Sequence, residues 1–495
     1  MSDALDRLKA RLADATSLGM VAQLLAWDQR TMMPPAGFRH RAEHLSLLQR
    51  LGHELLVDPE TGRLLDELER RELDPDSWEG ALVRVTRRDF EKAVQVPVAL
   101  SAEMARVAAE SAPVWLEAKA TSNFALFLPL MQRNVELRRR YVECFGPQEE
   151  PYDVLLDDFE PELKTSEVTS IFAELKPELK QLIVDLRDRD VDDSCLDGDF
   201  ALDEQVALDH EVVELFGHRP STWRIDPTEH PFAAGAGIDD IRITTHYYRE
   251  RFKALFATMH EYGHGLYQHQ LPADWAHLPV GQATGLAMHE SQSRLWENLV
   301  GRSLPFWRGF YPRLRQRFPQ FESVDVERFY VAINKAQPSL IRIDADEVTY
   351  GMHVILRFEL EQDIISSRIA LEDLPRLWAE KMDDYLGVEV PDDARGVLQD
   401  MHWSSGLIGY FSTYLLGTVM SVQIWEKARE ELGDLDEQVE RLEFGALREW
   451  LGERIHSQGR RYPSQELLRR ATGSTIDAKP YLAYLERKYG APVAA

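Results

Sequence analysis

Cysteine is scarce in this 495-residue chain, and its scarcity excludes a disulfide-stapled fold. Only Cys144 and Cys195 occur, too few to form a framework of disulfides in a chain of this length. Such low cysteine use fits a reducing compartment, so we expect the protein in the cytoplasm. The opening residues, MSDALDRLKARL, are charged and amphipathic and do not read as a secretory signal.

Positive charge is scarce relative to negative charge. The chain has 57 Lys and Arg against 84 Asp and Glu, a formal net charge of −27. This excess repels nucleic acids and anionic membranes, and no basic run opposes it, so we expect neither as a partner. The acidic excess identifies no substrate, because a solvated acidic surface explains it equally well.

Long uncharged stretches are also rare. The exception, Gly406 to Trp425, is long enough to span a bilayer. It contains several Ser, Thr and Tyr residues, however, and no cluster of Lys or Arg flanks it. We therefore predict a buried helix here and no membrane span.

Repeats, low-complexity tracts and Ser/Gly-rich linkers are absent. Length alone allows two to four domains, yet nothing in the sequence divides the chain. Apolar residues at helical spacing dominate from start to end. We predict one mainly α-helical domain over 1–495, with two lobes separated by a cleft. A lid-like helical lobe would cover about 1–220, and the second lobe about 221–495.

The segment His260-Glu261-Tyr262-Gly263-His264 matches the pattern H-E-x-x-H. Residues four apart share a helix face, so His260 and His264 can bind one metal ion while Glu261 reaches a metal-bound water. Apolar spacing predicts a largely buried helix from Phe252 to about Gln268. The alternative is a helix with two unrelated surface histidines. A buried helix rarely carries His, Glu and His without a partner, so we predict a zinc hydrolase.

A third metal ligand is expected downstream, because catalytic zinc usually takes three protein ligands and leaves one position for water. Gly285 to Leu299 is a second predicted helix that carries the adjacent residues His289 and Glu290. Glu290 is favoured, since a glutamate from a second helix is common in zinc peptidases, and His289 would then support the ligands. Glu290 can also pair with Arg294, and the two roles are compatible. Co²⁺ or Mn²⁺ can replace Zn²⁺ at such a site.

Six motifs in order make the chain similar to the carboxypeptidase Taq family of HExxH zinc metallocarboxypeptidases. They are HPF at 230–232, DxRxT at 240–244, HEYGH at 260–264, HESQ at 289–292, IRxxAD at 341–346 and GxxQDxHW at 396–403. The resemblance implies a helical, two-lobed zincin-type metallopeptidase with a deep cleft, a small edge β-sheet near the site, and a homodimer. It also implies His260, His264 and Glu290 as metal ligands and Glu261 as general base.

Peptide hydrolysis needs a hydrogen-bond donor for the developing oxyanion. His402, Tyr410 and Tyr414 are candidates, because related helical zincins place a His and a Tyr late in the chain. Either tyrosine can instead be a half-buried core aromatic whose hydroxyl finds a backbone carbonyl.

An enzyme that acts at a free C-terminus must also recognise a carboxylate. Arg242 and Arg342 lie in two of the matched motifs, and a guanidinium meets a carboxylate with two parallel hydrogen bonds. Alternatively, Asp240, Asp344 and Asp346 pair with these arginines as structural salt bridges. The sequence does not separate the two interpretations.

A short strand is predicted from Ile241 to Thr245, where β-branched residues alternate. Zinc peptidases often place an edge strand beside the cleft, where an extended substrate adds as a further strand. The preceding residues, Phe232 to Gly237, are small and are predicted to form a loop, either mobile or a simple connector.

The sequence therefore predicts a metal-dependent carboxypeptidase, homodimeric and cytoplasmic, that removes single C-terminal residues from peptides with broad specificity. An endo-oligopeptidase or dipeptidyl carboxypeptidase on the same scaffold is one alternative. A non-catalytic helical binding protein that keeps zinc for structure is the other, and it would have a closed fourth coordination position and no need of Glu261.

Overall fold

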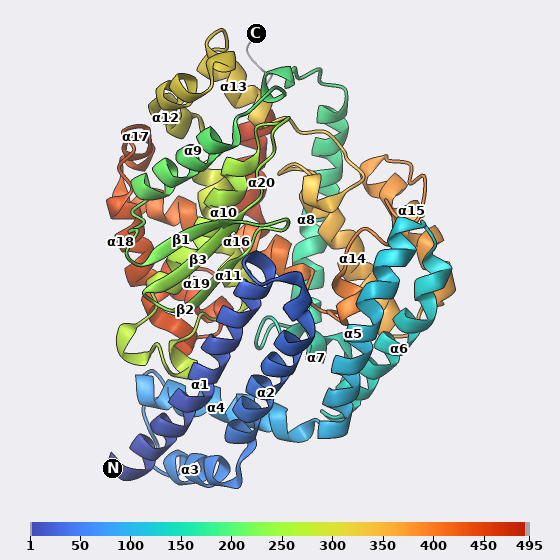
Figure 1. The fold of residues 1–495 in the computed structure, drawn as a ribbon, viewed down its shortest axis with the longest axis vertical. Helices are drawn as coiled ribbons and strands as arrows, with labels where there is room; N and C mark the ends of the chain where they lie inside the picture. The colour runs from blue at the N-terminus through green and yellow to red at the C-terminus, as the bar shows by residue number, and fades with distance from the viewer. Residues whose placement is uncertain (1, 491–495) are drawn as a thin grey trace.

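The computed structural model describes residues 2–490 and confirms a mainly α-helical fold with one small β-sheet (Figure 1). The helices are α1 (Ser2–Thr31), α2 (Phe38–Val57), α3 (Pro59–Glu69), α4 (Trp78–Gln95), α5 (Val98–Ala120), α6 (Phe124–Glu143), α7 (Tyr152–Asp157), α8 (Thr165–Arg187), α9 (Leu202–Leu215), α10 (Ala254–His269), α11 (Leu286–Arg294), α12 (Leu304–Arg317), α13 (Val326–Ile333), α14 (Tyr350–Ile365), α15 (Leu374–Leu386), α16 (Ser412–Leu432), α17 (Leu435–Glu440), α18 (Gly445–Arg454), α19 (Ser464–Thr472) and α20 (Ala478–Leu485). The strands are β1 (Trp223–Pro227), β2 (Ala233–Gly237) and β3 (Asp240–Thr245).

Three hydrophobic clusters hold these elements together, the smallest of which joins α5 to α6 through Leu100, Val107 and Leu137. The largest cluster contains buried residues from Trp115 to Tyr489, and the intermediate one joins α1, α3 and α4 to Leu278 and Val280. In Figure 1 the N-terminal helices α1 to α6 lie along the lower and right side, while the sheet lies left of centre. The intermediate cluster therefore anchors α1, α3 and α4 to the chain that follows α10.

The sheet confirms the predicted strand but not the predicted loop. β3 contains the expected residues, and its Ile241 and Ile243 are fully buried. β3 is central, however, with β1 parallel on one side and β2 antiparallel on the other. The edge strand is β2, which the sequence analysis assigned to a loop, because alanine and glycine have little strand preference of their own. Pairing with β3 makes these residues a strand.

Helices α10, α11 and α16 agree closely with the sequence predictions. α10 and α11 lie within the predicted helical segments, and a π-helical turn, Leu295–Val300, continues α11. Residues 412–425 of the uncharged stretch form the buried first part of α16, whereas residues 406–411 precede that helix in turns and irregular backbone, so the predicted helix begins six residues too early. None of the helices in 2–490 is long and apolar enough to cross a membrane. Two glycines let these helices touch: a Cβ on Gly263 would collide with the backbone of Gln292, and one on Gly417 with Glu290.

Replacing Gly417 by alanine should destabilise the protein, although alanine normally favours a helix interior. The new Cβ would lie 2.6 Å from Glu290 Cβ and 2.8 Å from the Ala287 carbonyl oxygen. Overpacking of this kind costs about 1–3 kcal/mol. Gly19→Ala in α1 is the matched control, because no atom lies within 4 Å of its new Cβ, and it should be neutral or slightly stabilising. Equal denaturation midpoints for the two variants would contradict this packing.

Asp209 of α9 should make stability fall as the pH rises. Its buried carboxylate accepts a 2.6 Å hydrogen bond from Thr258 of α10, and burial raises the pKa of Asp209 from 3.8 to about 7. Between these values the folded protein holds a proton that the unfolded chain has lost, so unfolding becomes easier with each pH unit. The free energy of unfolding of Asp209→Asn relative to wild type should therefore rise by roughly 2.5 kcal/mol from pH 5 to pH 8. Urea titrations at several pH values measure the free energy of unfolding of both proteins. A difference between the two that does not change with pH would refute this assignment.

Candidate metal centre and active site

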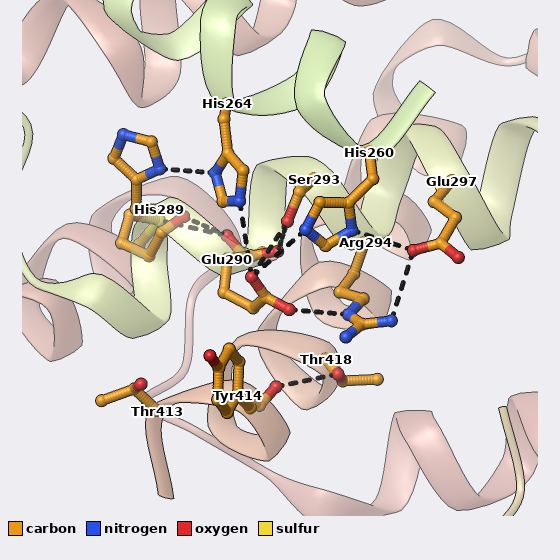
Figure 2. A network of polar contacts seen from close by, with 12 residues as sticks. His260, His264, His289, Glu290, Ser293, Arg294, Glu297, Thr413, Tyr414 and Thr418 are labelled. Carbon is orange, nitrogen blue, oxygen red and sulfur yellow. Dashed lines mark hydrogen bonds and ion pairs between the residues drawn. The ribbon is translucent and has the colours of Figure 1, made fainter. Parts of the chain in front are cut away.

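Three side chains from two helices converge on one point (Figure 2). His260 and His264 come from α10 and Glu290 from α11, and one donor atom of each lies within 4.8 Å of the others. Glu290 Oε2 is 3.7 Å from His260 Nε2 and 3.5 Å from His264 Nε2. Ligands about 2.0–2.1 Å from a tetrahedral zinc ion are themselves roughly 3.3 Å apart. The donor set and its spacing therefore fit a zinc-sized ion.

Each histidine turns its Nε2 toward this point because its other nitrogen is engaged. His260 Nδ1 lies 2.9 Å from Glu297 Oε2, and His264 Nδ1 lies 2.6 Å from His289 Nδ1. If the His264 nitrogen donates in this pair, His289 must be neutral, and burial lowers the pKa of His289 to about 3. The structure thus brings Glu290 to the centre and places His289 behind His264, as the sequence analysis favoured.

Behind Glu290, side chains of positive and negative charge alternate. Its Oε1 accepts a 2.7 Å hydrogen bond from Arg294 Nε, and Arg294 Nη1 lies 3.3 Å from Glu297 Oε2. Arg302 approaches the other oxygen of Glu297 at 3.6 Å. Burial opposes ionisation of Glu290, yet Arg294 and the two histidines hold its pKa well below the usual range. The sequence analysis missed Glu297; its one signal is its place two helical turns after Glu290.

Glu261 lies beside the three donors in a cavity of about 340 Å³. Its carboxylate is buried, and its Oε2 has no hydrogen-bond partner among residues 2–490. Burial raises the pKa of Glu261 above its ordinary value. A buried carboxylate oxygen without a partner is costly, so this atom is available to a ligand or water. The cavity is lined by Pro231, Phe232, Ala233, His260, Glu261, His264, Leu286, His289, Glu290, Tyr410, Thr413 and Tyr414.

The three candidate oxyanion donors lie together on one side of the cavity. Tyr410 and Tyr414 line it, and His402 stands behind them with its Nε2 3.3 Å from the Tyr414 hydroxyl. Burial lowers the pKa of His402 to about 4, so its imidazole is neutral near pH 7. Phe159 packs edge-on against Tyr410, with ring centroids 5.2 Å apart. The two tyrosines therefore line the cavity directly, whereas His402 is connected to the cavity through its contact with Tyr414.

Arg242 is paired with an acid that the sequence analysis named. Its Nε and Nη2 donate to the two carboxylate oxygens of Asp240 at 2.8 and 2.9 Å, and its guanidinium lies 4.3 Å from the Trp27 ring. Asp240 is therefore close enough to compete with a substrate carboxylate for this arginine.

Arg342 is also paired, but with a different acid from those expected. Its Nη2 lies 2.8 Å from Asp400 Oδ1, and its Nη1 donates to the Tyr350 hydroxyl at 3.1 Å. Asp344 lies near Lys253 instead, and Asp346 accepts backbone hydrogen bonds. Asp400 is distant in sequence, so its pairing depends on tertiary structure.

A second cavity, of about 300 Å³, extends the site along β2 toward α1. It shares Phe232, Ala233, His264 and His289 with the first cavity, so the two adjoin. Gln23 and Arg30 of α1 line its far side. The two cavities follow the edge strand of the sheet past the three candidate metal ligands.

Comparison with known proteins agrees with this geometry. The model of the family described as "Carboxypeptidase Taq (M32) metallopeptidase" matches residues 7–489. Thermostable carboxypeptidase 1 of Thermus thermophilus is 41% identical over 488 residues, 96% of each chain, and carboxypeptidase 1 of Bacillus subtilis is 34% identical over 94% of each chain. The crystal structure of the M32 carboxypeptidase from Deinococcus radiodurans R1 matches with a TM-score of 0.94 at 35% identity, over 98% of this chain and 99% of that one. The chain therefore belongs to the carboxypeptidase Taq family of M32 metallopeptidases.

Proposed function

We propose that this chain is a zinc metallocarboxypeptidase that removes single C-terminal amino acids from peptides of varied sequence. One observation carries the proposal: His260, His264 and Glu290 converge in a cavity beside the buried, unpartnered carboxylate of Glu261. A structural zinc site would be closed by a fourth protein ligand, whereas an open cavity beside three ligands suits a catalytic one. The cytoplasmic location and the homodimer belong to the same proposal.

Zinc would be held by the two Nε2 atoms and the Glu290 carboxylate. When bound, the ion supplies Lewis acidity that polarises a scissile carbonyl and lowers the pKa of water. His289 and Glu297 hold the two imidazoles in the required orientation through their Nδ1 atoms. Two imidazoles and a carboxylate also accept Co²⁺ or Mn²⁺, so the proposal of zinc rests on the donor set typical of zinc peptidases.

Glu261 would act as the general base. Its carboxylate accepts a proton from the attacking water and delivers it to the leaving amine. Its buried position strengthens it as a base, because burial disfavours its charged form. Tyr410 and Tyr414 offer hydroxyl groups to the oxygen that gains negative charge, and His402 orients the second of them.

Substrate binding would use the edge of the sheet. An extended peptide can pair with the free edge of β2, which runs along both cavities. Arg342 and Arg242 are the candidates for the substrate carboxylate. Arg342 is the better placed of the two, since its guanidinium lies 5.0 Å from the ring of Tyr414 at the cavity wall. It would bind the carboxylate while keeping its contact with Asp400.

Activity on blocked peptides tests the proposal. We expect an N-blocked tripeptide with a free C-terminus to lose its last amino acid, and the same peptide with a C-terminal amide to remain intact. Chelation should abolish hydrolysis, and added Zn²⁺ should restore it. Mass spectrometry of the products distinguishes the alternatives: cleavage of the amide indicates an endo-oligopeptidase, and release of a dipeptide indicates a dipeptidyl carboxypeptidase. No hydrolysis of either peptide by the zinc-loaded protein would refute an enzymatic role.

Glu261→Gln should separate catalysis from metal binding. Loss of the base should lower kcat by roughly 10²–10⁴-fold. Zinc affinity should stay within a few fold of wild type, because Glu261 is not among the proposed ligands. Glu297→Gln is the contrasting variant: it should weaken zinc binding by about 10–100-fold and leave most of kcat at saturating zinc. Competition with a chromogenic chelator measures the affinities, and the roles are wrong if the two variants behave alike.

A further inference from the structure

Residues 399–410 carry His402 and Tyr410 but form no regular helix or strand. Only a short 3₁₀ turn, His402–Ser405, interrupts the irregular backbone, and Gly406 and Gly409 have positive φ angles of 67° and 99°. Such a segment cannot fix its own shape by repeating backbone hydrogen bonds. Beyond a few local turns such as Leu407 N–H to the His402 carbonyl, contacts from outside the segment therefore help to set where its side chains point.

Glu361 of α14 supplies these contacts on both flanks of the segment. Its side chain is fully buried, and its Oε1 accepts a 2.8 Å hydrogen bond from Trp403 Nε1. Its Oε2 accepts a 2.9 Å hydrogen bond from the Gly409 backbone N–H. Trp403 follows His402 directly, and Gly409 precedes Tyr410. One carboxylate thus holds the neighbours of two of the three candidate oxyanion donors, His402 and Tyr410.

The carboxylate of Glu361 is held by neutral donors alone. No cation of residues 2–490 lies within ion-pair distance of it, and Arg357, one turn earlier on α14, binds Asp400 and Gln399 instead. Burying a carboxylate without a counter-ion is unfavourable, and burial raises the pKa of Glu361 to about 7. A leucine or glutamine would fill the core at lower cost. The hydrogen bonds that Glu361 accepts are the gain that offsets this cost.

The same carboxylate ties the segment to the first half of the chain. Tyr152 of α7 donates its hydroxyl to Glu361 Oε2 at 2.6 Å. The chain after α7 brings Phe159 against the ring of Tyr410, and the Phe159 carbonyl accepts a hydrogen bond from the Leu286 N–H at the start of α11. Glu361 therefore joins α14, α7 and residues 399–410 near the site. It lines neither cavity and touches none of the proposed metal ligands.

We propose that Glu361 is a positioning residue, which fixes His402 and Tyr410 relative to the metal ligands through Trp403 and Gly409. The proposal rests on the proposed function, because it concerns the donors to the oxyanion. It differs from a purely structural role, in which Glu361 would stabilise the core without affecting turnover by the folded, metal-loaded enzyme.

The test replaces Glu361 by glutamine in the full, zinc-loaded chain. The side-chain amide keeps the shape but offers one acceptor oxygen, so either the Trp403 contact or the Gly409 contact is lost. We expect kcat per bound zinc to fall by about 10–100-fold, with KM and zinc affinity changed less than about threefold. Tyr152→Phe removes one donor but leaves both flanks held, so kcat should fall less than about threefold. Asp209→Asn, which replaces another buried carboxylate by an amide, controls for the loss of a buried acid as such, and its kcat should stay close to that of wild type.

Hydrogen exchange followed by mass spectrometry gives a readout that is independent of activity. Peptides covering 399–410 should exchange at least about tenfold faster in Glu361→Gln than in wild type, while peptides covering α10 and α11 should be unchanged. Unchanged exchange over 399–410, or unchanged kcat in a folded variant, would overturn the proposal. Loss of zinc affinity together with kcat would also overturn it. If wild type itself releases no C-terminal residue, the proposed function fails, and hydrogen exchange still decides whether Glu361 holds the segment.

Discussion

The close approach of α11 to its two neighbours, α10 and α16, is the constraint on which the site depends. Gly263 lets α10 touch the backbone of α11, and Gly417 lets α16 touch the other side of α11 at Glu290. A Cβ at Gly263 would lie 2.4 Å from the Gln292 carbonyl oxygen, and one at Gly417 would lie 2.6 Å from Glu290 Cβ, so a side chain at either position would push these helices apart. Glu290 Oε2 lies 3.5 Å from the Nε2 of His264, and that separation tolerates little displacement if both atoms are to share one ion. The spacing of the three candidate ligands is therefore a consequence of helix packing.

Buried charge is the second organising feature. Arg302, Glu297, Arg294 and Glu290 alternate in sign behind the ligands, so each charge has a partner that reduces the cost of its burial. Glu261 departs from this order, because one of its carboxylate oxygens has no partner in the part of the chain that is described. Departures from satisfied burial gather where a protein binds something else. This contrast supports Glu261 as the base and Glu297 as support for a ligand.

The sequence predicted those features that depend on short-range patterns. The H-E-x-x-H helix and the helix of Glu290 follow from spacing within one segment, and the structure confirms both helices. The strand at 233–237 was missed because its small residues become a strand only through pairing with β3. The partner of Arg342 was also predicted wrongly, since Asp400 is 58 residues away and the nearer acids bind other groups. Such contacts are set by tertiary packing, which spacing within a segment does not encode.

The active site is assembled from two parts that the chain builds separately. α10 and α11 bring the proposed metal ligands, whereas residues 399–414 bring the candidate donors. α16 connects them, because its first turns carry Tyr414 at the cavity wall and Gly417 against Glu290. Tyr414 is therefore linked to the candidate metal ligands through the close contact between α16 and α11. Tyr410 precedes that helix, and its carbonyl oxygen accepts hydrogen bonds from the N–H and the hydroxyl of Thr413 in the first turn of α16. The Gly409–Glu361 hydrogen bond holds the backbone on the other side of Tyr410, so the position of this ring depends on both contacts.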